Sequence, residues 1–279
     1  MKSLINFFER RKSAAIITLS VYYFLVVTMH LKFGKFVART LDVPLGRDNY
    51  NLIILGLATA LCLGFLFWFY KGLKHTSPKE RKITIAYLLL TLVLIIVSIN
   101  VIMVINIELI HIVQYAIFAI LLFPLIGRYF DVLFWTTFFG ALDELYQYMY
   151  LAPTSTDYFD INDVIINMLG AAMGLILVRS QGVFQNKADK PMLKSSWFWG
   201  IAAIFGIIFT LWITSQLTFY PNGEDVMFEF IRDFQPGFWR KIHPNVLFHV
   251  IQPLEGLVIL ILLFISYKKI KLEKHVNKL

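Results

Sequence analysis

Three groups of polar residues interrupt the apolar part of the sequence that runs from His111 to Gly174. They are His111 and Tyr115, then Asp143, Glu144 and Gln147, then Asp160, Asp163 and Asn167. A charged side chain at the centre of a membrane helix costs at least ~2.5 kcal/mol unless it is paired or hydrated. Several such residues close together are therefore a functional-site hypothesis by default.

The acidic groups allow three kinds of chemistry. Glu144 or His111 could act as a general base, with Asp163 orienting it, on a membrane lipid. Buried acids could instead couple the transport of a lipid or small molecule to a proton or a cation. A polar pocket could also simply bind a ligand, and we rank binding first, transport second and catalysis third.

A metal ion or plain helix packing could also account for these residues. Glu144, Asp160 and Asp163 could hold Mg²⁺ or Ca²⁺, which prefer oxygen ligands, but we expect no resident cofactor. The few histidines and the single cysteine argue against a zinc site. Polar side chains such as Asn167 can also bond to one another between helices without doing chemistry, and Asp160 can cap a helix.

Composition predicts a membrane protein. The chain is 58% hydrophobic and 16% charged, whereas soluble domains carry roughly 25% charged residues. Apolar stretches of about 18 residues or more, which suffice to cross ~30 Å of hydrocarbon, recur along the chain. They cover about 13–31, 51–70, 83–105, 109–127, 130–150, 161–179, 196–217 and 247–266. We therefore predict an all-α, polytopic transmembrane bundle of about eight helices in the cell membrane.

Further features refine this arrangement. The third and fourth stretches almost abut, so we expect a tight antiparallel hairpin. The first stretch follows basic residues and has no nearby cleavage site, which favours a retained signal-anchor helix. Cys62 lies mid-span, and we expect it to be packed in the core.

The distribution of Lys and Arg predicts the orientation. With the N-terminus inside, 19 of the 26 basic residues lie on the inner side and 7 on the outer side. Basic residues concentrate in cytoplasmic loops, so both termini should be cytoplasmic. All three polar groups then lie at one depth, on the extracytoplasmic side.

Residue spacing predicts which side chains share a face. Asp160, Asp163, Asn167, Gly170 and Gly174 step by three or four residues along one helix face. The GxxxG formed by the two glycines allows a partner helix to approach closely. We expect the helices of 109–127, 130–150 and 161–179 to face a shared, outward-opening pocket, which Glu255 of the last helix could join.

The order of these groups closely resembles the VanZ-like membrane family. The resemblance covers about residues 83–179 and rests on His111-Ile-Val-Gln-Tyr115, Asp143-Glu144-Leu-Tyr-Gln147 and Asp160-Ile-Asn-Asp163-Val-Ile-Ile-Asn167-Met-Leu-Gly170-Ala171. The family usually shows P-x-R-x-x-D before the last block, and here Asp157 stands where the Arg would align. The resemblance implies a teicoplanin-resistance-like role at the outer leaflet and cell wall.

The resemblance also suggests how the chain is divided and what it binds. We expect an N-terminal two-helix segment (1–82), a VanZ-like four-helix core (83–179) and a C-terminal two-helix segment (180–279). The outer loop 218–246 contains an amphipathic stretch, 224–234, that favours a short surface helix. The expected ligand is a lipid headgroup, a lipid-linked cell-wall precursor or a glycopeptide.

Several functions are not supported by the sequence. It contains no HExxH, GxSxG, P-loop or CxxC motif and no room for a nucleotide-binding domain, which excludes ATP-driven transport within this chain. The net charge of +8 fits an inward-facing surface beside anionic lipids, and nothing suggests a nucleic-acid partner.

Overall fold

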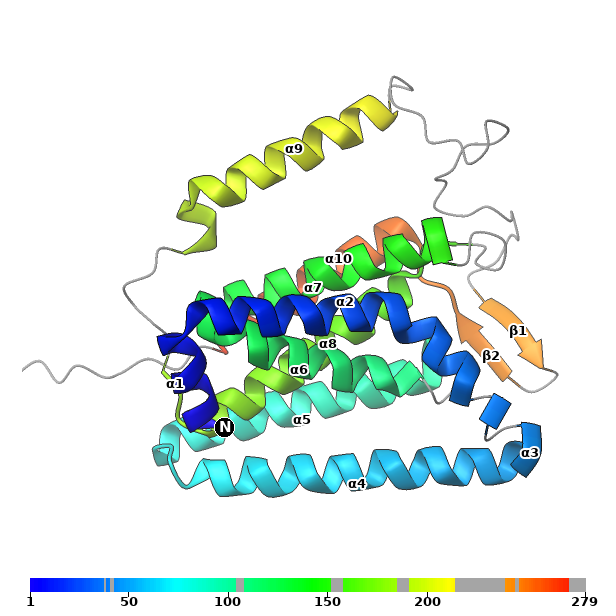
Figure 1. Cartoon of the computed structure of the whole chain (residues 1–279), viewed down its shortest axis with the longest axis horizontal. Coiled ribbons are helices and arrows are strands. Elements are labelled where there is room, and N and C mark those ends of the chain that lie inside the picture. Colours follow the sequence, from blue (N-terminus) through cyan, green and yellow to red (C-terminus); the bar gives the residue numbers. More distant parts are fainter. Residues whose placement is uncertain are drawn as a thin grey trace, which may run out of the picture.

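The computed structural model is a helical bundle with one small β-hairpin, which confirms the all-α class (Figure 1). It describes residues 1–37, 39–40, 43–103, 108–151, 158–184, 191–213, 239–243 and 246–270. Each predicted apolar stretch corresponds to one helix. These helices are α2 (Lys12–Val37), α4 (Arg47–Leu73), α5 (Pro78–Val101), α6 (Leu109–Ile126), α7 (Tyr129–Tyr146), α8 (Ile161–Ser180), α9 (Ser196–Ile213) and α10 (Pro253–Tyr267).

Shorter elements connect or flank these helices. They are α1 (Lys2–Arg10), α3 (Val43–Leu45), a π-helical turn η3 (Gln147–Leu151), a 3₁₀ turn η4 (Met192–Lys194), and the antiparallel strands β1 (Trp239–His243) and β2 (Val246–His249). The predicted surface helix at 224–234 and Asp157 lie outside the described residues.

Five helices are long and apolar enough to cross a membrane. Their apolar portions are Lys12–Met29, Asp48–Leu73, Pro78–Val101, Leu109–Ile126 and Ile161–Ser180. The outer helices α2 and α4 bury few of their apolar side chains against the rest of the bundle. Leu55, Leu61 and Phe67 on α4, for example, are more than half exposed. Such wide apolar surfaces are typical of helices that face lipid.

The helix in the last predicted span, 247–266, is shorter than this apolar stretch. Strand β2 takes up its beginning, and α10 starts only at Pro253. Pro253 lies in the first turn, and Gln252 and Glu255 form a reciprocal capping box that begins the helix there. The 15 residues of α10 extend over about 22 Å, less than the hydrocarbon thickness.

Helix α8 is the centre of the bundle, and nearly all of its side chains are buried. It packs against α4, α5, α6, α7 and α10. A Cβ atom added at Gly170 would lie 2.6 Å from the Ile112 carbonyl oxygen, and one at Gly174 would lie 2.3 Å from that of Ala116. The GxxxG therefore brings the α8 backbone directly against α6, as its spacing predicts.

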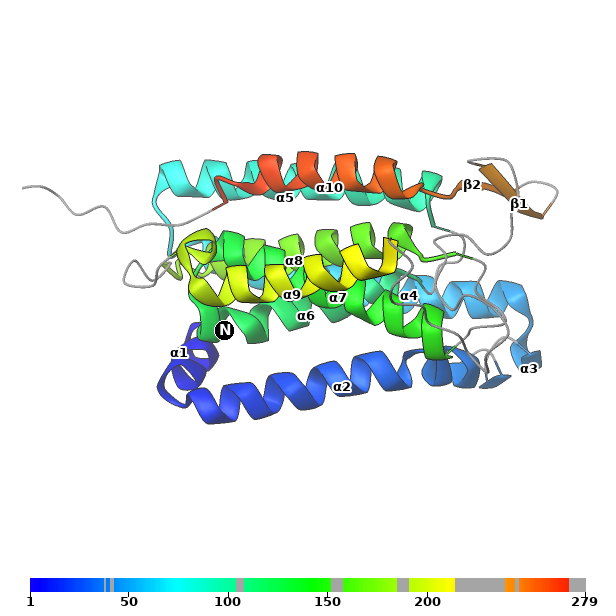
Figure 2. The same ribbon diagram turned by 90° about the horizontal axis from the view of Figure 1, so that it is seen from above.

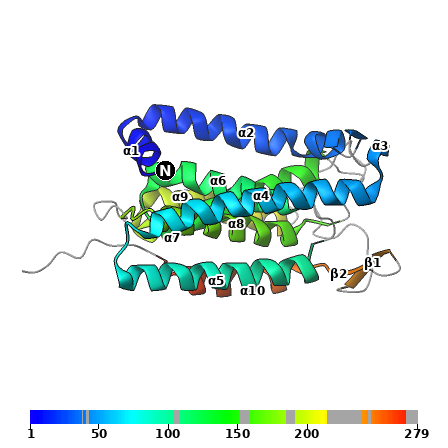
Figure 3. The same ribbon diagram turned by 90° about the horizontal axis from the view of Figure 1, so that it is seen from below.

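The tight hairpin predicted for α5 and α6 is wrong. Both helices pack against α8, and α5 makes its main helix contacts with it. Figures 2 and 3 show α5 and α10 along one side, α2 along the opposite side, and α6, α7 and α8 between them. The short link between α5 and α6 therefore does not make them packing partners, because both pack on α8, whose glycines admit the α6 backbone.

The prediction that Cys62 is packed in the core is also wrong. Cys62 is exposed on α4, a helix that contacts the bundle mainly near its C-terminal end. There Gly72 packs against Ser180 and Gln181. Among the residues that the structure describes, nothing covers the thiol at the middle of α4, where the leucines are exposed as well.

A buried arginine connects three elements at the end of the bundle where α1 lies. Arg179 of α8 donates from Nε to Thr84 Oγ1 (3.0 Å) and from Nη1 to the Ile270 carbonyl (2.8 Å). It also forms an ion pair through Nη2 with Glu80. This guanidinium ties the start of α5 and the end of α10 to α8.

Candidate polar site between helices α6, α7 and α8

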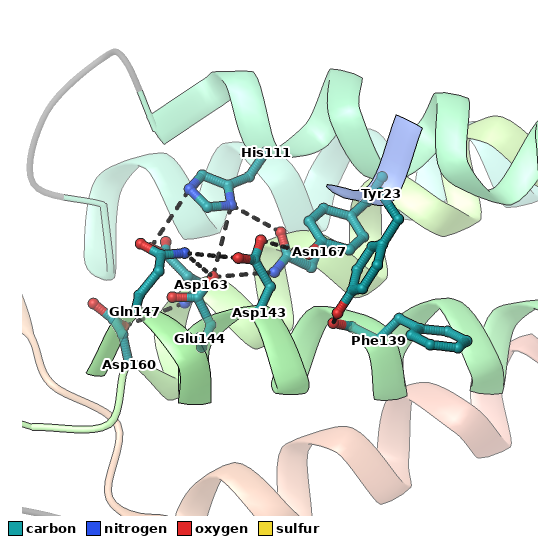
Figure 4. A network of polar contacts seen from close by, with 10 residues as sticks. Tyr23, His111, Phe139, Asp143, Glu144, Gln147, Asp160, Asp163 and Asn167 are labelled. Carbon is teal, nitrogen blue, oxygen red and sulfur yellow. Dashed lines mark hydrogen bonds and ion pairs between the residues drawn. The ribbon is translucent and has the colours of Figure 1, made fainter. Parts of the chain in front are cut away.

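The three polar groups come together at the end of the bundle opposite Arg179 (Figure 4). His111 lies in the first turn of α6, and Asp143 and Glu144 lie in the last turn of α7. Gln147 begins the π-helical turn η3, a local geometry that is frequent at functional sites. Asp163 and Asn167 lie in the first two turns of α8. Three separate helix ends thus place their polar residues at one depth.

His111 is oriented by an amide from α8. Asn167 donates from Nδ2 to Glu144 Oε1 (3.4 Å), so its Oδ1 is the atom that accepts from His111 Nδ1 (3.0 Å). His111 therefore carries its proton on Nδ1, and its Nε2 lies 3.7 Å from Asp163 Oδ2. The Nδ1 atom is also 4.0 Å from Glu144 Oε1. The imidazole thus lies between two carboxylates from different helices.

A second set of bonds holds the α7 acids. Tyr115 donates its hydroxyl to Asp143 Oδ2 at 2.8 Å. Gln147 donates from Nε2 to Asp143 Oδ1 and to Glu144 Oε1, both at 3.3 Å. A Cβ atom at Gly140 would lie 3.0 Å from Asn167 Cβ and 3.2 Å from Tyr115 Cε1. The glycine therefore lets α7 approach close enough for these bonds.

The described cluster is closed rather than open. His111, Tyr115, Asp143, Glu144, Gln147 and Asn167 are each at most 9% exposed. The Asp163 side chain is 17% exposed, and Asp160 is partly accessible as well. The described residues therefore form a packed polar network that is partly accessible at the two carboxylates that begin α8, which differs from the outward-opening pocket predicted from the spacing. Side chains long enough to reach their partners fill the space between the helices.

Asp160 has a different role from the other acids. Its Oδ1 accepts from the Asp163 backbone N–H (3.3 Å), which is the N-cap interaction of α8. Burial, together with the charge of Asp163, raises the pKa of the Asp160 carboxyl well above its usual range. The capping role considered for Asp160 is the one that the structure shows.

Glu255 does not join this cluster. Both of its carboxylate oxygens lie within hydrogen-bonding distance of His249 Nε2, at 2.8 and 2.9 Å. Glu255 also accepts from the Gln252 backbone N–H at 3.2 Å. The capping box that starts α10 holds this carboxylate against strand β2, so the expectation of a shared pocket does not hold for it.

Two residues outside the predicted set, the buried Asn162 and the half-buried Tyr23, support the site. Asn162 of α8 donates to the carbonyls of Ile102 (3.0 Å) and His249 (2.8 Å) and accepts from Ile251 N–H (3.0 Å). It thereby fastens the ends of α5 and β2 beside the cluster. Tyr23 of α2 donates to the Phe139 carbonyl of α7 at 2.9 Å. In the sequence, an asparagine next to Asp163 was the signal that could have indicated Asn162. No pattern in the sequence indicated Tyr23.

The structure also changes the candidate set of cation ligands. One ligand atom each from His111, Glu144 and Asp163 lies within 4.8 Å of the other two. The set considered from the sequence, where no resident cofactor was expected, was Glu144, Asp160 and Asp163. Asp160 is occupied in capping α8, and the imidazole of α6 takes its place in the described cluster.

Comparisons of the chain with protein-family models, with curated proteins and with solved structures find no match. The VanZ-like resemblance and the roles that it implies stay predictions, based on the residues quoted above.

Proposed function

We propose that this is a multi-pass cell-membrane protein with eight spans, both termini in the cytoplasm and its polar cluster toward the extracytoplasmic side. Five helices of sufficient length and apolarity support the membrane setting. The basic residues of α1 and of the α4–α5 connection lie at the end of the bundle opposite the cluster. This separation supports the orientation, because basic residues concentrate on the cytoplasmic side.

The polar cluster engages the headgroup of a membrane lipid, a lipid-linked cell-wall precursor or a glycopeptide, in a VanZ-like, teicoplanin-resistance-like role. The observation that carries this proposal is the convergence of His111, Glu144, Asp163 and their hydrogen-bonding partners from three helices at one end of the bundle. A headgroup at the membrane surface lies at that depth. Asp163, the partly accessible member, is the first group that it would meet.

Lipid analysis tests this proposal. Wild-type protein and the Glu144→Gln and Asp163→Asn variants are purified in a mild detergent, and the bound lipids are identified by mass spectrometry. We expect one lipid class to be enriched over its share in the membrane in wild type and to fall to that share in both variants. Glu255→Gln, a carboxylate outside the cluster, is the matched control. Lipids that mirror the membrane in all four proteins would contradict the proposal.

Cation-coupled transport is the second candidate. The observation that favours it is charge: Asp143, Glu144 and Asp163 surround a single imidazole in the described cluster, and no Lys or Arg of the described residues is bonded to them there. Uptake or release of a labelled lipid that depends on a proton or cation gradient, in vesicles containing the purified protein, would move transport ahead of binding.

A further inference from the structure

We propose that His111, Glu144 and Asp163 hold a divalent first-row transition-metal ion, and that an open coordination position of this ion receives a phosphate of the bound headgroup. The metal site is argued from the geometry of its ligands. The binding of a phosphate depends in addition on the proposed headgroup function. The inference begins from the three ligand atoms that lie within 4.8 Å of one another.

Distances in the cluster suit a shared ion. Ligand atoms bound to one metal at ~2.0–2.2 Å lie roughly 3.3 Å apart in a tetrahedral site. His111 Nε2 is already 3.7 Å from Asp163 Oδ2. Glu144 Oε1 lies 4.0 Å from Nδ1 of the same ring, so the Glu144 side chain must turn toward Nε2 to complete the site. Three protein ligands with a fourth position open is the usual arrangement where a metal binds a substrate.

The imidazole is oriented as a metal ligand. Asn167 Oδ1 accepts the proton on His111 Nδ1, which places the lone pair of the imidazole on Nε2, the atom that faces Asp163. Metal-bound histidines almost always donate their other ring N–H to an oxygen acceptor in this way. Asn167 in turn donates to Glu144, a second ligand of the proposed site. One amide therefore positions two ligands, which distinguishes this cluster from a group of acids alone.

The positive charge of a bound metal ion would let this acidic cluster attract a phosphate group. An acidic cluster by itself repels an anionic headgroup, and no Lys or Arg of the described residues is bonded to these acids. A bound dication would offset two of the carboxylate charges and present a positive centre to the phosphate oxygens. The mixture of one imidazole and two carboxylates favours Zn²⁺ or Mn²⁺ over Mg²⁺ and Ca²⁺, whose ligands are normally all oxygen.

Metal binding to the full-length protein in detergent tests the site directly. The protein is treated with a chelator, and Zn²⁺, Mn²⁺, Mg²⁺ and Ca²⁺ are added separately while stoichiometry and melting temperature are measured. We expect one tightly bound Zn²⁺ or Mn²⁺ per chain and a melting temperature that rises with its concentration. His111→Gln, Glu144→Gln and Asp163→Asn should each weaken binding more than about 100-fold, and Asn167→Ala about 10–100-fold.

The controls keep the test decisive. Glu255→Gln alters another His–carboxylate pair at the same end of the bundle and should bind the metal as wild type does. X-ray absorption of the metal-loaded wild-type protein should show imidazole scattering, so the proposal remains testable even where a variant fails to fold. Absence of saturable binding, a missing imidazole signal, equal binding by His111→Gln, or equal stabilisation by Mg²⁺ would overturn the metal site.

A lipid experiment separates this inference from the proposed function. Wild-type protein is placed in nanodiscs with phosphatidylglycerol or with an uncharged glycolipid, with and without the metal. Preferential, metal-dependent retention of phosphatidylglycerol supports the coordinated phosphate. Metal binding without such a preference would contradict the coordination of a phosphate but not the metal site. Selective retention of the glycolipid would support the headgroup function and contradict the coordination of a phosphate.

Discussion

His111 on α6 and Asn167 on α8 share a hydrogen bond of 3.0 Å beside the close contact of Gly170 with the Ile112 backbone. The close approach is made possible by Gly170 and Gly174, which leave room for the carbonyls of Ile112 and Ala116. Two short side chains can meet only because the helices are this near. The packing motif and the polar site are therefore parts of one arrangement.

Replacing Gly174 with alanine should destabilise the bundle and disturb the site. Its Cβ would meet the Ala116 backbone at 2.3–2.9 Å, so α6 must move away from α8. We expect a loss of about 1–3 kcal/mol in the free energy of unfolding, measured by denaturation in detergent micelles. Gly64→Ala on α4 is the matched control, because nothing lies within 4 Å of its Cβ. It should be neutral or slightly stabilising, since alanine is the better helix former; equal effects would argue against the close contact.

Glu144→Gln and Asp163→Asn should abolish the activity that is assayed, while the melting temperature of the chelator-treated protein holds or rises. Each substitution removes a charge that lies beside other carboxylates, and a glutamine at 144 keeps an oxygen that can accept from Gln147 and Asn167. Antibiotic susceptibility of cells and melting curves of the purified variants measure the two effects. A merely structural network would instead lose roughly 1–3 kcal/mol with each change, and activity would fall in proportion.

Cysteine labelling should place the two ends of the bundle on opposite sides of the membrane. In a Cys62→Ser background, a cysteine at the exposed position Asp48 should react with an impermeant maleimide in intact cells. A cysteine at the exposed position Lys79 should react only after permeabilisation. This expectation follows from the distribution of the basic residues, with 19 on the predicted inner side and 7 on the outer side. The reverse pattern would place the polar cluster on the cytoplasmic side.

Arg179→Met should be among the most destabilising single changes in the bundle, by about 3 kcal/mol or more. It leaves Glu80 and two buried acceptors without their donor at the junction of α5, α8 and α10. Glu80→Gln should cost less, because the amide oxygen can still accept from the guanidinium. Lys79→Met, an exposed neighbour, should stay within about 0.5 kcal/mol in the same denaturation assay. An effect of Arg179→Met no larger than this control would mean that the buried network contributes little.

The raised pKa of Asp160 predicts a defined pH dependence. The folded protein holds this proton more tightly than the unfolded chain, so the stabilisation is complete at low pH and is lost as pH rises through the folded pKa. Asp160→Asn keeps the cap of α8 and removes the titration. The difference in melting temperature between wild type and Asp160→Asn should therefore shift in favour of the variant from about pH 4 upward. A difference independent of pH would contradict the raised pKa.

Residue types and spacing were enough to predict the class of structure and much of the site. Apolar stretches of about 18 residues predicted helices, because a helix is the economical way to satisfy backbone hydrogen bonds in lipid. The period of three to four residues put Asp163, Asn167, Gly170 and Gly174 on one face, and the glycines predicted the close partner. These properties are local, so they can be read along the chain.

Which helices meet, and which acids they bring together, was decided only by the tertiary structure. Short connection suggested α5 as the partner of α6, but the smooth glycine face of α8 gives α6 a closer fit. Glu255 lies at a similar depth to Glu144, yet the capping box of α10 directs it to His249. His111 rather than Asp160 completes the group with Glu144 and Asp163, because Asp160 is used as the N-cap of α8. Such choices depend on competition between contacts distant in sequence, and spacing along one helix carries no information about its neighbours.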